Sequence, residues 1–184
     1  DRLITKLGAL KDRDRVHVII GPGTGAEGLA AVDWAARTNI PMLIGYSASE
    51  DITMRKAVRN VLRPGWTGPQ VTFHLGKYVH DELGYKKVVI VGEDYAFPWG
   101  QAAGFIRGFL ENGGEKVERI WYPVGTGDFS PIMAKLIGLA GEYDAVINNA
   151  SAVDAIGFFK QWHEFGMESF YPKPVSYTHL TLPT

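Results

Sequence analysis

The sequence contains no cysteine among its 184 residues. It therefore has no disulfide, no thiolate nucleophile and no cysteine metal ligand, although this absence does not indicate a cellular compartment. Long apolar runs are also missing, because uncharged apolar stretches such as 16–20 and 88–91 are far shorter than the roughly 20 residues that cross a bilayer. The sequence predicts no membrane-spanning helix.

Neither sign of charge is in excess. Nineteen Lys and Arg face 20 Asp and Glu, which gives a formal net charge of −1. A nucleic-acid partner is not expected, because phosphate-backbone binding depends on a basic excess. The hydrophobic share of 46% and the aromatic share of 12% are ample for a packed core and exclude a disordered chain. The length predicts one domain or two small ones.

Short β-branched apolar runs alternate along the chain with stretches that have the spacing of amphipathic helices. This alternation predicts an α/β fold of parallel βαβ units, with helices on both faces of open sheets. Pro64-Gly65 and Gly68-Pro69 mark the best candidate for a boundary between two lobes. We predict strands at 16–20, 40–44, 57–62, 87–91, 117–122 and 145–148, and helices at 3–10, 26–37, 71–83, 100–111, 129–139 and 153–165.

Local patterns of a catalytic or metal site are absent from the sequence. There is no GxSxG elbow, no HExxH motif and no nucleophile set beside a base, so we assign no catalytic residue and predict that the protein is not an enzyme. His80 and His163 each lie beside acids on the polar side of a predicted helix. Neither has a second histidine at metal-ligand spacing, so no metal site is predicted.

Residues 23–28 read GTGAEG and match GxGxxG between a predicted strand and a predicted helix. A dinucleotide site needs an acid at the tip of the next strand, but that tip reads Ile44-Gly45-Tyr46, and Glu50 and Asp51 come several residues later. The glycines fit better with a tight turn that presents helix N-terminal amides to an anion such as a carboxylate. No cofactor is predicted.

A series of short motifs follows in order along the chain at nearly ungapped spacing. They are VIIGPGTG at 18–25, NIPMLIGYSAS at 39–49, LRPG at 62–65, KKVVIVGED at 86–94, FPWG at 97–100, GDFS at 127–130 and FKQWHEFGM at 159–167. Together they resemble the motifs of the branched-chain amino-acid (leucine/isoleucine/valine-binding) receptors of ABC transporters, which are type I periplasmic substrate-binding proteins. The resemblance covers about residues 3–174.

This resemblance implies a type I periplasmic-binding-protein fold, with two Rossmann-like parallel-sheet lobes that are both incomplete here. By this comparison residues 1–69 are part of the first lobe and residues 70–175 are part of the second. Residues 176–184 resemble a translated sequencing adaptor, and we interpret them as a non-native tail. The chain is therefore expected to be a truncated fragment.

The function implied by the resemblance is that of the extracytoplasmic solute-binding component of an ABC transporter. Such a component lies in the periplasm or outside the cell, and its signal peptide would lie upstream of this sequence. Its partners would be a membrane permease and a small carboxylate, such as a branched-chain amino acid, bound between two lobes. Two alternatives stay open: a ligand-sensing domain of the same fold, and a nucleotide-cofactor enzyme on a doubly wound sheet.

The first lobe supplies two loops that match ligand contacts of the family. Thr24 and the backbone amide of Gly25 correspond to a hydroxyl and an amide that bind the ligand carboxylate. Ser47, Ala48 and Ser49 correspond to a second contact loop, in which either serine is a candidate donor. Their position after strands agrees with the rule that ligands bind at the carboxyl ends of parallel strands.

The second lobe matches the family less completely. Phe97 corresponds to a tyrosine that packs on the ligand, and Tyr95 on the same predicted loop adds to an aromatic wall. Another aromatic contact of the family falls on Ser151 or Ala152, and the acid that meets the ligand amino group lies beyond Pro174. A carboxylate without an amino group, or an amide, therefore also fits the residues that match.

Overall fold

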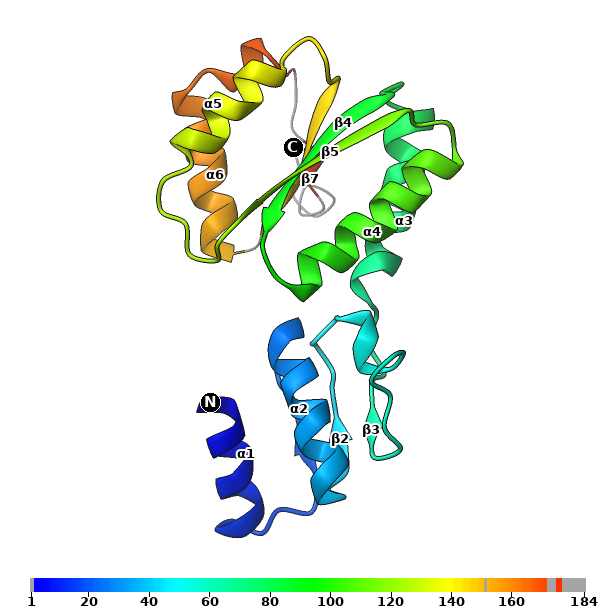
Figure 1. Cartoon of the computed structure of the whole chain (residues 1–184), viewed down its shortest axis with the longest axis vertical. Helices are drawn as coiled ribbons and strands as arrows, with labels where there is room; N and C mark the ends of the chain where they lie inside the picture. The colour runs from blue at the N-terminus through cyan, green and yellow to red at the C-terminus, as the bar shows by residue number, and fades with distance from the viewer. Residues whose placement is uncertain (1, 151, 172–174, 177–184) are drawn as a thin grey trace. The chain divides into compact units, whose positions relative to one another are not determined.

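The computed structural model describes residues 2–150, 152–171 and 175–176. The chain divides into two compact units, Asp1–Gly68 and Pro69–Thr184. Each unit has its own parallel sheet with helices packed on it, as Figure 1 shows. The predicted tail at 176–184 lies outside the described residues except for the backbone of Ser176.

The first unit is a three-stranded parallel sheet in the order β1-β2-β3. Two helices and a short 3₁₀ turn accompany these strands. In chain order the elements are α1 (Arg2–Asp12), β1 (Ile19–Ile20), α2 (Gly25–Thr38), β2 (Met42–Leu43), η1 (Glu50–Ile52) and β3 (Val61–Leu62).

All three strands of the first unit are shorter than the sequence predicted. The Val16 amide bonds back to the Leu10 carbonyl at 3.1 Å, so the ladder cannot begin at residue 16. Pro41 has no N–H to donate, and Asn39 has a left-handed φ of 56° as the C-cap of α2. The Ala57 amide closes a turn onto Met54. The apolar pattern therefore marked burial correctly but overestimated strand length.

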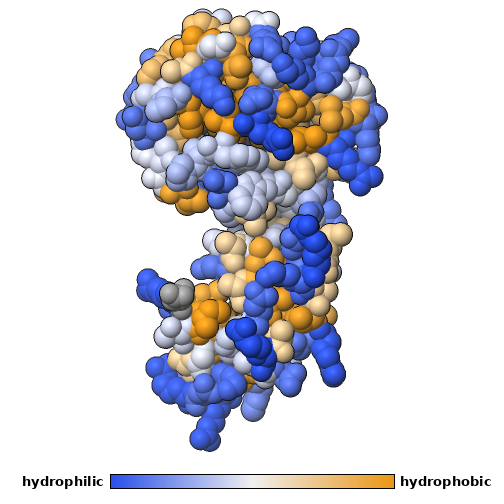
Figure 2. All heavy atoms as spheres, in the orientation of Figure 1, coloured by the Kyte–Doolittle hydropathy of each residue, from blue (hydrophilic) through white to orange (hydrophobic). Residues whose placement is uncertain are grey.

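One face of the first sheet is buried and the other is open. The helices pack over the buried face, and the core there consists of Leu7, Ile19, Ala31, Val32, Trp34, Ala35, Met42, Ile44, Ile52 and Val61. On the other face Val18, Ile20 and Leu62 are 52%, 75% and 66% exposed. Figure 2 shows hydrophobic residues reaching the surface of this unit. Strands of a parallel sheet are ordinarily apolar on both faces because both faces are covered.

The second unit is a four-stranded parallel sheet in the order β5-β4-β6-β7. Helices α3 and α4 pack on one face, and α5 and α6 pack on the other (Figure 1). The elements are α3 (Gly68–Asp81), β4 (Lys87–Glu93), α4 (Ala96–Glu111), β5 (Lys116–Tyr122), α5 (Ser130–Leu139), β6 (Ala145–Asn149), α6 (Ala152–Glu164), η2 (Met167–Ser169) and β7 (Val175–Ser176).

Strand β4 lies inside this sheet, and its side chains alternate between two cores. Val88 and Ile90 pack with α3 and α4, whereas Val89 and Val91 pack with α5 and α6. All four side chains are fully buried, as the continuous apolar run predicted. The same alternation directs Glu93, at the end of the strand, to the face that α5 and α6 cover.

Helix α4 begins at Ala96, earlier than the predicted start at residue 100. Tyr95 has extended backbone angles and acts as the N-cap, and Pro98 is tolerated because it lies in the first turn of the helix. The prediction that Phe97 lies on a loop is therefore wrong, since Phe97 belongs to the first turn of α4.

Glycines set the close approach of α3 and α4. Gly104 and Gly108 are four residues apart on α4, so they lie on the same helix face. A Cβ on Gly104 would overlap the carbonyl of Pro69, and a Cβ on Gly108 would overlap the carbonyl of Phe73. On the facing helix α3, a Cβ on Gly76 would lie 2.5 Å from the Phe109 amide nitrogen of α4. The two backbones therefore touch without intervening side chains.

Candidate ligand-binding site

Five of the eight buried polar or charged side chains among the described residues lie at, or soon after, the carboxyl ends of strands; the other three are Thr72 of α3, Gln101 of α4 and Asp154 of α6. In the first unit Ser47 and Ser49, which are 0% and 4% exposed, follow β2. In the second unit Glu93 ends β4, and Asn148 and Asn149 end β6, each at 3% exposure or less. Ligands of open parallel sheets bind at this edge. Each unit therefore has a polar edge where the sequence analysis predicted ligand contacts.

Thr24 is the N-cap of α2 and forms a capping box with Glu27. The Thr24 hydroxyl accepts from the Glu27 amide at 3.3 Å, and both the Thr24 amide and its hydroxyl donate to Glu27 Oε2 at 3.0 Å. The Glu27 carboxylate therefore accepts from both donors of Thr24 and leaves its negative charge at the N-terminus of α2. In the described part of the chain, the amides of Gly25 and Ala26 have no acceptor, as expected for a first helical turn.

Replacement of Thr24 tests this capping function. We expect Thr24→Ala to lower the free energy of unfolding of the first unit by about 1 kcal/mol, because the Glu27 amide loses its acceptor. Thr24→Ser keeps the hydroxyl and should retain nearly all of the stability. Urea unfolding followed by circular dichroism measures both variants. Equal stability of the alanine variant and the parent chain would show that the cap contributes nothing.

Ser47 connects the two predicted contact loops of the first unit. Its hydroxyl donates to the Pro22 carbonyl at 2.9 Å, so the loop after β2 is bound to the loop after β1. Gly28 of α2 permits this approach, since a Cβ there would lie 2.8 Å from the Ser47 Cβ. Ala48 is 3% exposed, and its carbonyl accepts from the Gly68 amide at 2.9 Å. The structure therefore brings the predicted loops together. The hydroxyl proton of Ser47 is already donated to the Pro22 carbonyl.

Arg63 supports the same edge and was not assigned a role from the sequence. Its guanidinium donates to the Ser49 carbonyl through Nη1, and to the Thr53 hydroxyl through Nη2 at 2.6 Å. Burial lowers the pKa of Arg63 from its ordinary value, although the charge of Glu50 opposes this effect. The only sequence signal was its place in the LRPG motif directly after β3.

Tyr95 and Phe97 are neighbours in the second unit, as predicted. Their ring centroids are 6.5 Å apart, with an angle of 40° between the ring planes, and both side chains are half-buried. Tyr95 lies at the N-cap of α4, and Phe97 is the second residue of the helix. Their contact with a ligand stays a prediction.

A second group of polar residues in this unit was missed by the sequence analysis. Burial, together with the charges of Glu93 and Asp154, raises the pKa of the Tyr122 phenol far above its ordinary value. Asp154, at the start of α6, is 7% exposed and accepts from the Gly125 amide at 2.8 Å. The signal that could have found Glu93 was a charged residue ending an otherwise apolar strand.

Several buried polar atoms of the second unit have no hydrogen-bond partner among the described residues. Asn148 Oδ1 accepts from the Ala150 amide at 2.9 Å, but its Nδ2 is unbonded, as are both side-chain polar atoms of Asn149 and of Gln101. The Tyr122 hydroxyl is likewise unbonded. Buried polar groups ordinarily have protein or water partners. These groups can bond to water or to a polar ligand.

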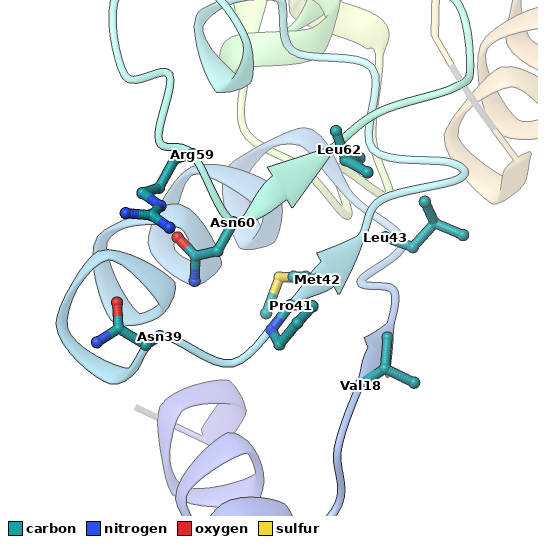
Figure 3. Close-up of a pocket in the computed structure, with 8 residues that line it drawn as sticks. All are labelled: Val18, Asn39, Pro41, Met42, Leu43, Arg59, Asn60 and Leu62. Carbon is teal, nitrogen blue, oxygen red and sulfur yellow. The ribbon is translucent and has the colours of Figure 1, made fainter.

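A hollow of the first unit lies away from the predicted contacts. It encloses about 540 Å³, within the range of small-molecule pockets. Figure 3 shows its lining residues around the beginnings of β2 and β3 and on the open face of the sheet: Val18, Asn39, Pro41, Met42, Leu43, Arg59, Asn60 and Leu62. None of these residues was predicted to bind a ligand.

Two absences apply to the described ranges only. Within them, no three His, Asp or Glu side chains lie close enough together to bind a metal ion. None of the helices described has both the length and the apolar character that a membrane crossing needs. Ser151, where the family has an aromatic contact, lies outside the described residues.

Each unit consists of a parallel sheet with helices packed on it and with polar side chains at the carboxyl ends of strands. This architecture defines the class of Rossmann-like α/β proteins, which bind ligands at that edge. A family model described as "Periplasmic binding protein" matches residues 1–175. The chain therefore belongs to the periplasmic binding protein family, which is a family of binding proteins and not of enzymes. This membership confirms the family resemblance that the motifs indicated.

Individual relatives agree with this assignment. The chain is 29% identical over 157 residues to Leu/Ile/Val-binding protein homolog 6 of Brucella melitensis, which covers 85% of this chain and 39% of that protein. An ABC transporter substrate-binding protein from Sphaerobacter thermophilus is 30% identical, with a TM-score of 0.79 over 92% of this chain and 47% of that one. The chain thus spans less than half the length of either relative.

A third relative has been solved with a ligand. A solute-binding protein of an ABC transporter from Rhodopseudomonas palustris BisB5, in complex with 3,4-dihydroxybenzoic acid, is 28% identical to this chain. Its TM-score is 0.80, and the match covers 91% of this chain and 45% of that one. These likenesses confirm the predicted type I periplasmic-binding-protein fold.

Proposed function

We propose that the chain is part of the solute receptor of an ABC transporter and that its ligand is a small carboxylate. The observation that carries this proposal is the concentration of buried polar side chains at the carboxyl ends of strands in both units. The other buried polar side chains of the described residues are Thr72 and Gln101, where α3 meets α4, and Asp154 at the start of α6. Residues 1–69 and 70–175 would be parts of the first and second lobes.

The ligand class follows from what the named ligands of relatives share. Leucine, isoleucine and valine in the Brucella protein's name, and the dihydroxybenzoic acid in the Rhodopseudomonas complex, all carry a carboxylate on an apolar body. In this chain the amides of Gly25 and Ala26 and the hydroxyl of Ser49 would meet the carboxylate. For the second unit, taken by itself, Tyr95 and Phe97 are the proposed contacts for an apolar ligand surface.

The receptor would act outside the cytoplasm and deliver its ligand to a membrane permease. Family membership and the names of the relatives support this placement. The same comparisons favour a receptor over a nucleotide-cofactor enzyme. A ligand-sensing role would use the same site.

Glu27 provides a sharp test of the carboxylate site. Its charge repels any carboxylate that approaches the amides of Gly25 and Ala26, and two like charges about 4 Å apart interact by about 1 kcal/mol even in bulk water. Glu27→Gln keeps an oxygen that can bond to Thr24 but removes the charge. We expect the affinity for leucine or 3,4-dihydroxybenzoate, measured by titration calorimetry, to rise about tenfold.

Two controls make this test specific. The methyl ester of the acid that binds should be weaker in the parent chain and should not improve in the Glu27→Gln variant. Asp12→Asn, on the exposed end of α1, removes the same charge from the first unit and should change no affinity. Equal affinities for acid and ester in every variant would remove the carboxylate proposal.

A further inference from the structure

A second hollow lies on the second unit, along the groove that α4 forms with strand β5. It encloses about 520 Å³, which is within the range of small-molecule pockets. Strand β5 is an edge of the described sheet, because it pairs with β4 alone. The lining includes Trp99, Ile106 and Arg107 of α4 and Arg119 and Trp121 of β5. None of these residues belongs to the carboxyl-end site proposed above.

Each of the two tryptophans of this groove contacts a residue of the segment 92–94. The Trp99 indole N–H donates to Asp94 Oδ1 at 3.1 Å, while 49% of the residue stays exposed. Trp121 packs over Gly92, where a Cβ would lie 2.9 Å from the indole ring. Rings that are already ordered lose little entropy when a flat molecule packs on them.

The two arginines differ in how their charge is balanced. Arg107 Nε donates to Glu111 Oε1 at 2.8 Å, and its guanidinium lies 5.7 Å from the centre of the Phe73 ring. Arg119 makes no ion pair within the part of the chain that the structure describes. The groove therefore combines apolar ring surface with one guanidinium that lacks a carboxylate partner.

From this arrangement we infer that the groove is a second binding site, separate from the carboxyl-end site, for a small planar aromatic anion. The aromatic ring of the ligand packs against the indoles and Ile106, and its carboxylate pairs with the Arg119 guanidinium. Guanidinium is the side chain that matches a carboxylate in geometry and charge, and indoles bind flat rings by stacking. An acidic segment of a protein partner would use the arginine but not the ring surface.

Benzoate and its neutral isostere benzamide test the site on the complete 184-residue chain. We expect benzoate to bind with a dissociation constant of about 1 mM, in the range of small ligands, and benzamide to bind at least tenfold more weakly. Arg119→Gln should weaken benzoate about tenfold and leave benzamide unchanged. Ala103→Glu places a negative charge at an exposed position of the groove and should abolish benzoate binding.

A nitrogen-15 correlation spectrum shows where benzoate binds. The indole N–H signals of Trp99 and Trp121 should shift when benzoate is added. Lys160→Gln, on the exposed surface of α6, is the matched control and should change nothing. Benzoate binding that responds to Glu27→Gln but not to Arg119→Gln would support the carboxyl-end site and overturn the groove. Binding of an acidic peptide with no response to benzoate, or unchanged benzoate affinity in both groove variants, would also overturn it.

Discussion

Gly108→Ala is expected to lower the free energy of unfolding of the second unit by about 3 kcal/mol. The added methyl group would overlap the carbonyl of Phe73, and a backbone carbonyl in the middle of α3 cannot rotate away as a side chain can. Either α3 and α4 separate or both helices distort, and each response opens the core beneath them. Chemical unfolding followed by the circular dichroism signal measures the loss.

Gly138→Ala is the matched control for this substitution. Gly138 also lies in a helix, α5, but it is exposed and no atom lies within 4 Å of the position of its Cβ. Alanine favours the helix over glycine by up to about 1 kcal/mol, so this variant should be as stable as the parent chain or more stable. Similar stability of both alanine variants would contradict the close contact of α3 and α4.

Self-association through the open face of the first sheet is the second large effect that we expect. Ile20 and Leu62 are branched apolar side chains, 75% and 66% exposed, and both are in register with Leu43, so they lie on the same face of the sheet. Contiguous exposed apolar surface promotes association between copies. The double variant Ile20→Thr and Leu62→Thr places a β-branched residue, which suits a strand, at each position and should weaken association at least about tenfold.

Sedimentation velocity over a range of protein concentrations measures this change. Val153→Thr with Ile156→Thr is the control, because these residues of α6 are 77% and 71% exposed but belong to the other unit. That pair should leave the association constant as it is in the parent chain. If association instead followed the α6 pair, the open sheet face would not be the contact.

Much of the fold was predictable because burial leaves a pattern in the sequence. The run 88–91 is apolar at every position, and it is buried on both faces of the sheet as predicted. Strand length in the first unit was not predictable. A ladder needs a neighbouring strand in register, and local features such as Pro41 and the bond from Val16 to Leu10 end it early. The predicted start of α4 at residue 100 was four residues late, since the helix begins at Ala96 and accommodates Pro98 in its first turn.

The site was predictable only where position alone identifies a residue. The loops around Thr24 and Ser47 follow strands, and the structure brings them together through the Ser47 hydroxyl. The competition from Glu27 was missed, although Thr24-Gly25-Ala26-Glu27 has the S/T-x-x-E spacing of a capping box. Glu93 and Asp154 were missed because their shared neighbour, Tyr122, belongs to a strand distant in sequence from both.

The chain contains five tryptophans, and two of them are enclosed, one in each unit. Trp34 is 6% exposed in the core of the first unit, and Trp162 is 2% exposed in the core of the second. An enclosed indole emits at shorter wavelength than one in water, so each unit carries an intrinsic fluorophore that reports its own unfolding. Loss of structure in one unit while the other persists is therefore an event that emission spectra can resolve without any label.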